Sequence, residues 1–262
     1  YVVLLDWEKA FDRVTHDMLF EALEWQGVPD KYIKLIKALY ADPCFQVEID
    51  GKKSDPKKQK RGIRQGCPLS PYLFILTMDA VFHLVNQTTQ DSTTSIMPGV
   101  NLDFNSILYA DDTLLLADSK VAAEALLHAI EEVSDLFGLA LNKQKCVAIP
   151  SVHQENLAFT NGEAMKNDTT AEYLGTMLHH KANTDLEVRR RITLATAVWR
   201  NLEHFWKNTD ISIKFRLRVY DAVIRSKLIY GLESARLTDL LRAKLVGFQL
   251  RGLRQILKLQ HP

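Results

Sequence analysis

Apolar and polar positions alternate along the first two thirds of the chain in a way that mixes strands with helices. Residues 1–6 form an apolar run that ends at Asp6, which is typical of a buried strand. Apolar residues recur at helical spacing in segments near 15–26, 30–41, 70–87 and 120–137. Further strands are predicted at 44–50, at 144–149, at 171–178 and in a hairpin over 104–118. The short strands at 144–149 and 171–178 are expected to complete a sheet.

The residues that flank these segments predict where helices begin and end. Ser70, followed by Pro71, is a candidate N-cap for the helix near 70–87, and Ser119 is one for the helix that follows the hairpin. That helix is expected to bury Val121, Leu126, Ile130, Val133 and Phe137 and to end at Gly138. A Thr- and Ser-rich loop is expected at 88–98, and the lysines between 52 and 60 are expected to lie in a basic loop.

Beyond residue 185 the pattern becomes entirely helical. One apolar stripe runs through Val188, Ile192, Ala195, Trp199, Leu202 and Trp206. Further helices are predicted near 210–230 and 237–258. Their aromatic and leucine side chains are expected to form a core rather than platforms for nucleic-acid bases. The pattern therefore passes from a mixed α+β part to a helical part, which is compatible with one large domain or with two smaller ones.

Charge is distributed unevenly between these parts. The formal net charge of the 262 residues is only +1. Arg189 to Lys258 hold 16 Lys and Arg against 5 Asp and Glu, a balance of +11, whereas the preceding 188 residues hold 17 against 27, a balance of −10. A basic part beside an acidic one suits a protein that binds a polyanion and a metal, although basic helix faces exposed to solvent would give the same count.

Composition narrows the class of protein. At 47% hydrophobic and 25% charged residues, the chain can bury a sizeable core. Its three cysteines, Cys44, Cys67 and Cys146, have no paired spacing, which indicates a reducing compartment and argues against a disulfide framework or a zinc site. No apolar run reaches 18 residues, so neither a membrane span nor a signal peptide is predicted.

Three aspartates are the candidate chemistry. Asp111 and Asp112 lie between the apolar stretches of the predicted hairpin, and Asp6 ends the first strand. Adjacent carboxylates repel each other, and divalent cations such as Mg²⁺, which prefer oxygen ligands, would reverse that repulsion. Each feature alone has a simpler interpretation, because Asp also favours turns and helix starts.

A basic, glycine-punctuated segment precedes the helix near 70–87. Arg61, Arg64, Gln65 and Gly66 lie in it, and such a loop can bring backbone N–H groups and Arg side chains to phosphates. An ordinary loop-to-helix connection is the alternative interpretation of this segment taken by itself.

The order of these segments resembles the palm of reverse transcriptases, most of all those of the non-LTR (LINE-type) retrotransposon family. Five motifs carry the resemblance: Leu-Asp-Trp-Glu-Lys-Ala-Phe-Asp-Arg-Val at 5–14, Arg-Gln-Gly-Cys-Pro-Leu-Ser-Pro at 64–71, Tyr-Ala-Asp-Asp at 109–112, Gly-Leu-Ala-Leu-Asn at 138–142 with Lys145, and Glu-Tyr-Leu-Gly at 172–175. Group II intron enzymes resemble the chain less. The likeness continues through 228–233 and 251–254 into the thumb.

The resemblance implies a right-hand polymerase palm, a small antiparallel sheet backed by helices, in residues 1–183. It implies an all-helical thumb and the start of a downstream connector in 184–262. The chain opens inside the first motif, so the fingers are expected to be largely missing, and the chain is expected to be a piece of a larger polyprotein with an endonuclease, or a degraded copy.

The resemblance also implies roles for individual residues. Asp6, Asp111 and Asp112 would bind two Mg²⁺ ions, with Mn²⁺ as a possible substitute, and Lys145 would donate a proton to pyrophosphate. Residues implied to contact the incoming nucleotide are Trp7, Phe11, Gln65 and Gly66, with Glu8 as a further backbone donor. Phe11 would exclude a 2′-hydroxyl. Leu174 and Gly175 would form the primer grip, and Arg61 and Arg64 would contact the template or primer backbone.

Asp12 and His16, by contrast, are expected to have structural roles, with Asp12 bonded to neighbouring backbone or to a basic side chain.

The implied function is RNA-directed DNA polymerisation, with an RNA template, a DNA primer and a dNTP as partners and without a membrane. Two alternatives stay open: an inactive or decayed copy that only binds nucleic acid, and a group II intron-type maturase that stabilises folded RNA. The family's way of life implies an intracellular location, in the nucleus.

Overall fold

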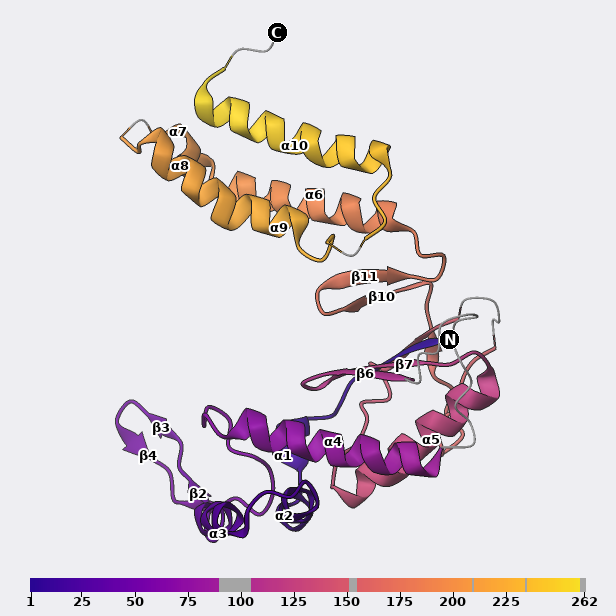
Figure 1. Ribbon diagram of the computed structural model, residues 1–262. Coiled ribbons are helices and arrows are strands. Elements are labelled where there is room, and N and C mark those ends of the chain that lie inside the picture. Colours follow the sequence, from indigo (N-terminus) through magenta and orange to yellow (C-terminus); the bar gives the residue numbers. More distant parts are fainter. Residues whose placement is uncertain (90–104, 151–154, 209, 234, 260–262) are drawn as a thin grey trace. The chain divides into compact units, whose positions relative to one another are not determined.

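A computed structural model of the chain describes residues 1–89, 105–150, 155–208, 210–233 and 235–259. The loop expected at 88–98 lies almost wholly outside the described residues. The chain divides into two compact units, Tyr1–Thr169 and Thr170–Pro262. Each unit has its own set of helices and strands (Figure 1).

The first unit is built around a five-stranded sheet in the order β6-β7-β1-β8-β9. Its strands are β1 (Val2–Leu5), β6 (Ser106–Tyr109), β7 (Asp112–Leu116), β8 (Val147–Ile149) and β9 (Lys166–Asn167). Strand β1 is central and pairs antiparallel with β7 and β8, whereas β9 runs parallel to β8. Side chains alternate across β1, so Val3 and Leu5 are buried, as the apolar run predicts.

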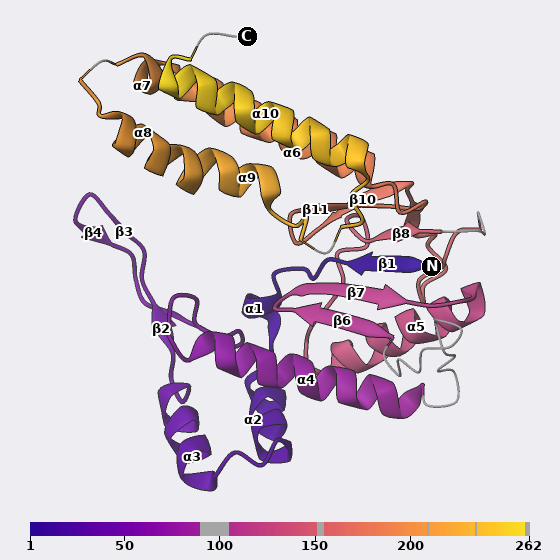
Figure 2. The same ribbon diagram turned by 45° about the horizontal axis from the view of Figure 1, so that its top comes forward.

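Helices cover this sheet on one face, where α4 and α5 lie along it (Figure 2). The helices of the unit are α1 (Ala10–Arg13), α2 (His16–Trp25), α3 (Asp30–Leu39), α4 (Ser70–Thr88) and α5 (Lys120–Leu136). The four longer ones confirm the segments predicted from helical spacing. Mixed helix and sheet with a small, mainly antiparallel sheet is therefore confirmed for this unit.

Of the two predicted N-caps, the structure confirms Ser119 and contradicts Ser70. The hydroxyl of Ser119 accepts a hydrogen bond from the Ala122 N–H at 3.2 Å, so this N-cap is confirmed. The N-cap prediction for Ser70 was wrong, because Leu69 takes that position and the Ser70 hydroxyl donates to the Arg64 carbonyl instead. Val121, predicted to be buried, lies one position after the start of α5 and is 78% exposed.

The segment 44–61 forms paired strands rather than one strand and a loop. Strand β2 (Cys44–Phe45) pairs with β5 (Lys57–Lys58), and β3 (Glu48–Ile49) pairs with β4 (Lys52–Lys53). Asp50 and Gly51 make the two-residue turn between β3 and β4, and both have positive φ. Asp-Gly is the sequence that this turn type favours, so the sequence did contain a signal for this hairpin.

The second unit begins with a hairpin of its own. Strands β10 (Thr170–Tyr173) and β11 (Thr176–His179) pair only with each other, so the prediction that 171–178 completes the larger sheet was wrong. A two-residue turn at Leu174 and Gly175 lets the chain fold back at once. The hairpin packs on the helix that follows it, and the second compact unit therefore begins at Thr170. The division into palm and thumb after residue 183 stays a prediction.

Helices make up the rest of the second unit: α6 (Thr184–Asn201), α7 (Glu203–Lys207), α8 (Ile213–Val219), the π-helix η2 (Tyr220–Arg225), α9 (Ser226–Ile229) and α10 (Asp239–Leu257). The rings of Trp199 and Trp206 stack at 4.5 Å and pack with buried Tyr220, Ile224 and Leu228. This confirms that the aromatic stripe is a core. In the described part of the chain, no helix is long and apolar enough to cross a membrane.

Candidate active site

Asp6 lies directly after β1, where two backbone contacts fix its position. Its carbonyl accepts from the Asn142 N–H at 2.8 Å, and its N–H points to the Cys146 sulfur at 3.5 Å. Trp7 and Leu141 form an antiparallel bridge that prolongs the sheet by one step. Burial raises the pKa of the Cys146 thiol to about 11, so this sulfur is a neutral packing group beside Asp6 at ordinary pH.

Asp111 and Asp112 lie at the tip of the β6–β7 hairpin. Tyr109 pairs with Asp112, which leaves Ala110 and Asp111 as the two-residue turn, with Ala110 at a φ of 53°. Both aspartates are exposed, while Thr113 and Leu114, which follow them, are buried. The hairpin therefore anchors its apolar strand in the core and holds its two carboxylates in solvent.

The sheet register brings the three aspartates to one edge. Leu5 pairs with Thr113 in the β1–β7 ladder, so one further step places Asp6 beside Asp112. The pKa of Asp112 is raised, first because surrounding atoms displace water from it and then because the charges of Asp111 and Asp6 repel its ionised form. The negative charge that the sequence predicted at this edge is thus present.

Carboxylate oxygens of this kind suit a hard divalent cation, and their mutual repulsion is what such a cation would relieve. The side chains do not form a finished site, however. Among the described residues, no group of three His, Cys, Asp or Glu side chains is arranged to hold a metal ion. The donor chemistry fits Mg²⁺, and the ligand set Asp6, Asp111 and Asp112 stays a prediction.

Lys145 is a cation that lies at this edge. Its Nζ lies 3.6 Å from Asp6 Oδ1, and both side chains are substantially exposed, so the pair contributes little stability by itself. The position lets a protonated amine reach the same space as the carboxylates. Its role as a proton donor stays a prediction.

Trp7 and Phe11 differ in how much of each side chain a nucleotide could contact. The Trp7 indole is buried and donates to Thr113 Oγ1 at 3.1 Å, so only its backbone is left for a nucleotide. The expected contribution of Glu8 was wrong, because its N–H donates to the Ala140 carbonyl at 2.8 Å. Phe11 is partly buried and stacks on Phe74, with ring centroids 4.4 Å apart and planes at 18°.

Loop 61–66 is fastened to the first motif by its backbone. The Gly62 N–H donates to the Val14 carbonyl at 2.7 Å, and the Ile63 N–H donates to the Phe11 carbonyl at 2.6 Å. The Gly62 carbonyl contacts His16 Nε2 at 3.0 Å, which confirms a structural role for this histidine. These bonds place Gln65 and Gly66 close to the segment that carries Asp6.

Gln65 donates to Asp12 Oδ1 at 3.1 Å, so the partner of Asp12 is an amide, not the backbone or basic group expected. Arg64 donates to the Leu39 carbonyl at the end of α3 at 3.1 Å and lies over the Tyr40 ring, whereas Arg61 is exposed. Gly66 has a φ of 83° that a side chain would disfavour.

A groove of about 650 Å³ opens beside this loop. Its lining combines residues that the sequence singled out with others that it did not: Asp12, Cys44, Phe45, Gln59, Arg61, Ile63, Arg64 and Gln65. Phe45 and Gln59 were missed because their approach to Arg61 depends on the pairing of β2 with β5. The Asp50-Gly51 turn signal could have indicated that pairing.

Leu174 and Gly175, the predicted primer grip, lie in the second unit at the β10–β11 turn. The carbonyls of both residues are bonded to side chains of the same unit, Leu174 to Tyr230 and Gly175 to Arg190 and Arg191. The structure thus shows a turn that is held firmly, and contact with a primer stays a prediction.

Comparison with known proteins points in one direction. Residues 1–178 match the family model described as reverse transcriptase (RNA-dependent DNA polymerase). A polyprotein from the type-2 retrotransposable element R2DM of Drosophila melanogaster is 31% identical over 57% of this chain and 14% of its own length. A type-1 R2 polyprotein of Popillia japonica is 26% identical over 90% of this chain and 39% of its own length.

The RNA-directed DNA polymerase from the mobile element jockey of Drosophila melanogaster is 25% identical over 87% of this chain and 25% of its own length. The chain thus spans between about a seventh and two fifths of these relatives. A solved structure of telomerase from Candida albicans with a fragment of telomeric RNA aligns over 97% of this chain and 44% of the other. Its identity of 15% and its TM-score of 0.41 make that likeness too weak to support an argument.

Proposed function

This chain belongs to the reverse transcriptase (RNA-dependent DNA polymerase) family, in its non-LTR retrotransposon branch, and we propose that it carries the nucleotidyl-transfer centre of a larger polyprotein. The observation that supports this most is the gathering of Asp6, Asp111 and Asp112 at one edge of the sheet, where loss of hydrating water and then the charges of the other two raise the pKa of Asp112. The proposed substrates are a dNTP, a DNA primer and an RNA template. The proposed place of action is the nucleus, by resemblance to the family.

The three aspartates would hold two Mg²⁺ ions, or Mn²⁺ in their place, which when bound activate the primer 3′-hydroxyl and neutralise charge on the triphosphate. Asp6 is proposed to be a direct ligand because its backbone is fixed from two sides. Asp111, at the apex of the turn, is proposed as the second. Asp112, whose carboxylate is the one destabilised by its neighbours, is proposed to support them.

Lys145 is proposed to protonate the pyrophosphate as it leaves. Its amine lies at the carboxylate edge and is exposed, so a triphosphate bound there would replace Asp6 as its partner. General acid catalysis of this kind contributes typically about 10²–10⁴-fold to a rate. Loss of the amine would therefore slow the chemical step without preventing nucleotide binding.

Selection of deoxynucleotides is proposed to depend on Phe11. Stacking on the buried Phe74 ring leaves Phe11 little freedom to turn aside, so a 2′-hydroxyl that met it would collide with a fixed surface. Gln65, Gly66, Arg61 and Arg64 are proposed to contact the nucleotide and the template backbone, from the groove that they share or adjoin.

Primer extension on an RNA template with Mg²⁺ tests this function. Asp111→Asn should lower the rate at least roughly 10²–10³-fold, the effect of losing several kcal/mol of charge stabilisation. Asp17→Asn is the matched control, because it makes the same chemical change at an exposed position of α2. Extension that survives Asp111→Asn, or no extension by the unmodified chain, would contradict the proposal. Duplex binding without any extension would favour a protein that only binds nucleic acid.

A further inference from the structure

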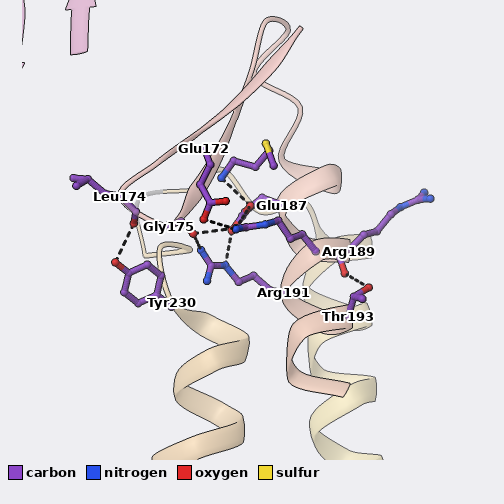
Figure 3. Close-up of polar contacts among 10 residues, drawn as sticks. Glu172, Leu174, Gly175, Glu187, Arg189, Arg191, Thr193 and Tyr230 are labelled. Carbon is purple, nitrogen blue, oxygen red and sulfur yellow. Dashed lines mark hydrogen bonds and ion pairs between the residues drawn. The ribbon is translucent and has the colours of Figure 1, made fainter. Parts of the chain in front are cut away.

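A buried ion pair lies in the second unit, at the start of α6 and against the β10–β11 hairpin (Figure 3). Glu187 and Arg191 are one helical turn apart and only 4% and 3% exposed, and Arg191 Nε donates to Glu187 Oε1. Charges buried to this degree persist only when their remaining donors and acceptors are bonded as well. Those remaining bonds show what the pair holds in place.

The remaining bonds lead to the hairpin. Glu187 Oε2 accepts from the Met177 N–H at 2.9 Å, and Arg191 Nη2 donates to the Gly175 carbonyl. The neighbouring Arg190 adds a second bond to the Gly175 carbonyl at 3.0 Å and another to Glu172 Oε1 at 2.5 Å. The buried pair thus binds strand β11 and the turn, and Arg190 adds the bond to strand β10.

Tyr230, which follows α9, holds the other carbonyl of the turn. Its hydroxyl donates to the Leu174 carbonyl at 3.0 Å, and its ring faces the Arg191 guanidinium at 4.8 Å (Figure 3). Tyr230 is itself half exposed, so burial of its ring does not explain this contact. The side chains that bond the carbonyls of this two-residue turn are therefore those of Arg190, Arg191 and Tyr230, which come from two separate segments of the chain.

The turn has a conformation that its sequence does not favour. Leu174 has a φ of 47° and Gly175 a φ of 74°. Glycine adopts the left-handed region freely, but leucine rarely does, and such a residue persists where its surroundings determine the conformation. Because the peptide plane is trans, the N–H of Gly175 points opposite to the Leu174 carbonyl, away from Tyr230. The bond to Tyr230 thus fixes this backbone donor in an outward direction, away from that side chain.

We propose that Glu187, Arg191 and Tyr230 form a turn clamp, a set of positioning residues that fixes the Leu174–Gly175 turn so that its outward N–H meets a phosphate of the primer strand. This inference rests on the proposed polymerase function. A donor held in one orientation loses little conformational entropy on binding, so the clamp acts on primer affinity. It leaves the chemical step at the aspartates unchanged.

Tyr230→Phe is the most selective test, because it removes the hydroxyl and keeps the ring that faces Arg191. We expect the Kd of a DNA-primed RNA template, measured by fluorescence anisotropy without dNTP, to rise roughly two- to tenfold, the effect of removing one hydrogen bond. Maximal extension rate at saturating duplex should stay the same. Hydrogen exchange of amides in 172–177 should become faster.

Arg189→Gln is the matched control. Arg189 lies on the same helix, is exposed and pairs with Asp185, so its loss removes a positive charge without touching the turn. It should leave hydrogen exchange at 172–177 unchanged. Arg191→Lys is a second variant that keeps the charge but loses the planar fork, and it should change Kd and exchange in the same direction as Tyr230→Phe.

Faster exchange together with weaker duplex binding would support the clamp. Unchanged exchange in Tyr230→Phe would overturn it, as would faster exchange with unaltered Kd, because the turn would then be held but would not contact the primer. An equal loss of affinity in Arg189→Gln would also overturn it by indicating general electrostatic attraction. Absence of duplex binding by the unmodified chain would instead refute the proposed function, and exchange alone would still report on the turn.

Discussion

Asp112 shows at the scale of one residue how a site for charge destabilises its own protein. Its pKa is raised above the usual 3.8, so the folded protein resists ionising this carboxyl more than the unfolded chain does. Above the folded pKa, ionised Asp112 therefore costs stability. Below about pH 3.8 the group is protonated in both states, and the cost disappears.

Asp112→Asn should consequently raise the Tm at neutral pH, because the amide is isosteric and carries no charge. The difference in Tm from the unmodified protein should shrink as pH falls from 7 toward the usual Asp pKa of 3.8. Thermal unfolding at a series of pH values measures it, with Asp17→Asn as the control at an exposed site. A variant that is less stable at neutral pH would show that Asp112 is bound by a partner rather than repelled by its neighbours.

Because Gly62 has no side chain, its loop can lie close against the backbone of the first motif at Asp12. Gly62 has a φ of 91°, and a Cβ would lie 2.7 Å from the Asp12 carbonyl oxygen, a backbone atom that cannot rotate away. Gly62→Ala should therefore lower the free energy of unfolding by roughly 2–4 kcal/mol. Denaturant unfolding measures this loss.

Gly162→Ala is the matched control for Gly62→Ala. Gly162 also has a positive φ, 81°, but nothing lies within 4 Å of its added Cβ. The control isolates the cost of backbone strain from the cost of the clash. Equal losses of stability in both variants would contradict the close approach of Gly62 to Asp12.

At the scale of elements, the spacing of apolar residues predicted the helices, because helix formation depends mainly on local sequence. The helices α2, α3, α4 and α5 were found because one apolar face repeats along each of them. Pairing partners were harder, because the strand 171–178 reads the same whether it joins a large sheet or folds on itself. The Leu174-Gly175 turn decides this, and leucine at positive φ is not a recognised turn signal.

The residues of the candidate sites also fall into two groups, those that short motifs reveal and those that only the fold reveals. Asp6, Asp111 and Asp112 could be named from short motifs, and the β1–β7 register then brings them together. Phe45, Gln59 and the Glu187–Arg191 pair could not be named, because each acquires its setting from residues distant in sequence. A buried ion pair in particular looks in sequence like any exposed pair one helical turn apart.

The paired strands β2–β5 and β3–β4 carry lysines in two kinds of setting. Lys57 pairs across the strands with exposed Phe45, and Lys52 with exposed Ile49. Lys53 and Lys58 face carboxylates, with Nζ to oxygen distances of 3.8 Å to Glu48 and 3.0 Å to Asp42. The first pair of lysines is therefore freer to neutralise phosphates beside an apolar surface, the arrangement found where single strands bind.

Lys52→Gln with Lys57→Gln should weaken binding of single-stranded RNA and reduce the salt dependence of its binding constant, by roughly 0.7 in the log–log slope for each phosphate that the protein no longer neutralises. The control is Lys53→Gln with Lys58→Gln, which removes the same charge from lysines that are already paired. Anisotropy titrations over a range of salt concentrations measure both slopes. Equal changes in the two double variants would show that only total charge matters.

At the scale of the molecule, the two units differ in the sign of their net charge, and each has its own hydrophobic core. The acidic N-terminal part of the chain contains the three aspartates, and the basic segment from Arg189 to Lys258 lies in the helical second unit. The buried cluster around Val3, Leu19 and Leu127 lies in the first unit, and the cluster around Trp206 and Tyr220 lies in the second. A divalent cation should therefore stabilise the first unit, whereas a polyanion should also stabilise the second.

Hydrogen exchange with Mg²⁺ alone and with duplex alone should separate these effects. Mg²⁺ binding at the aspartates should slow exchange in the first unit around Leu5–Trp7 and Tyr109–Thr113, because a ligand that binds only the folded state opposes local opening. Asp111→Asn should abolish this protection and Asp17→Asn should not. Duplex in the absence of Mg²⁺ should protect 172–177 in the second unit. Protection that Asp111→Asn leaves intact would place the cation elsewhere.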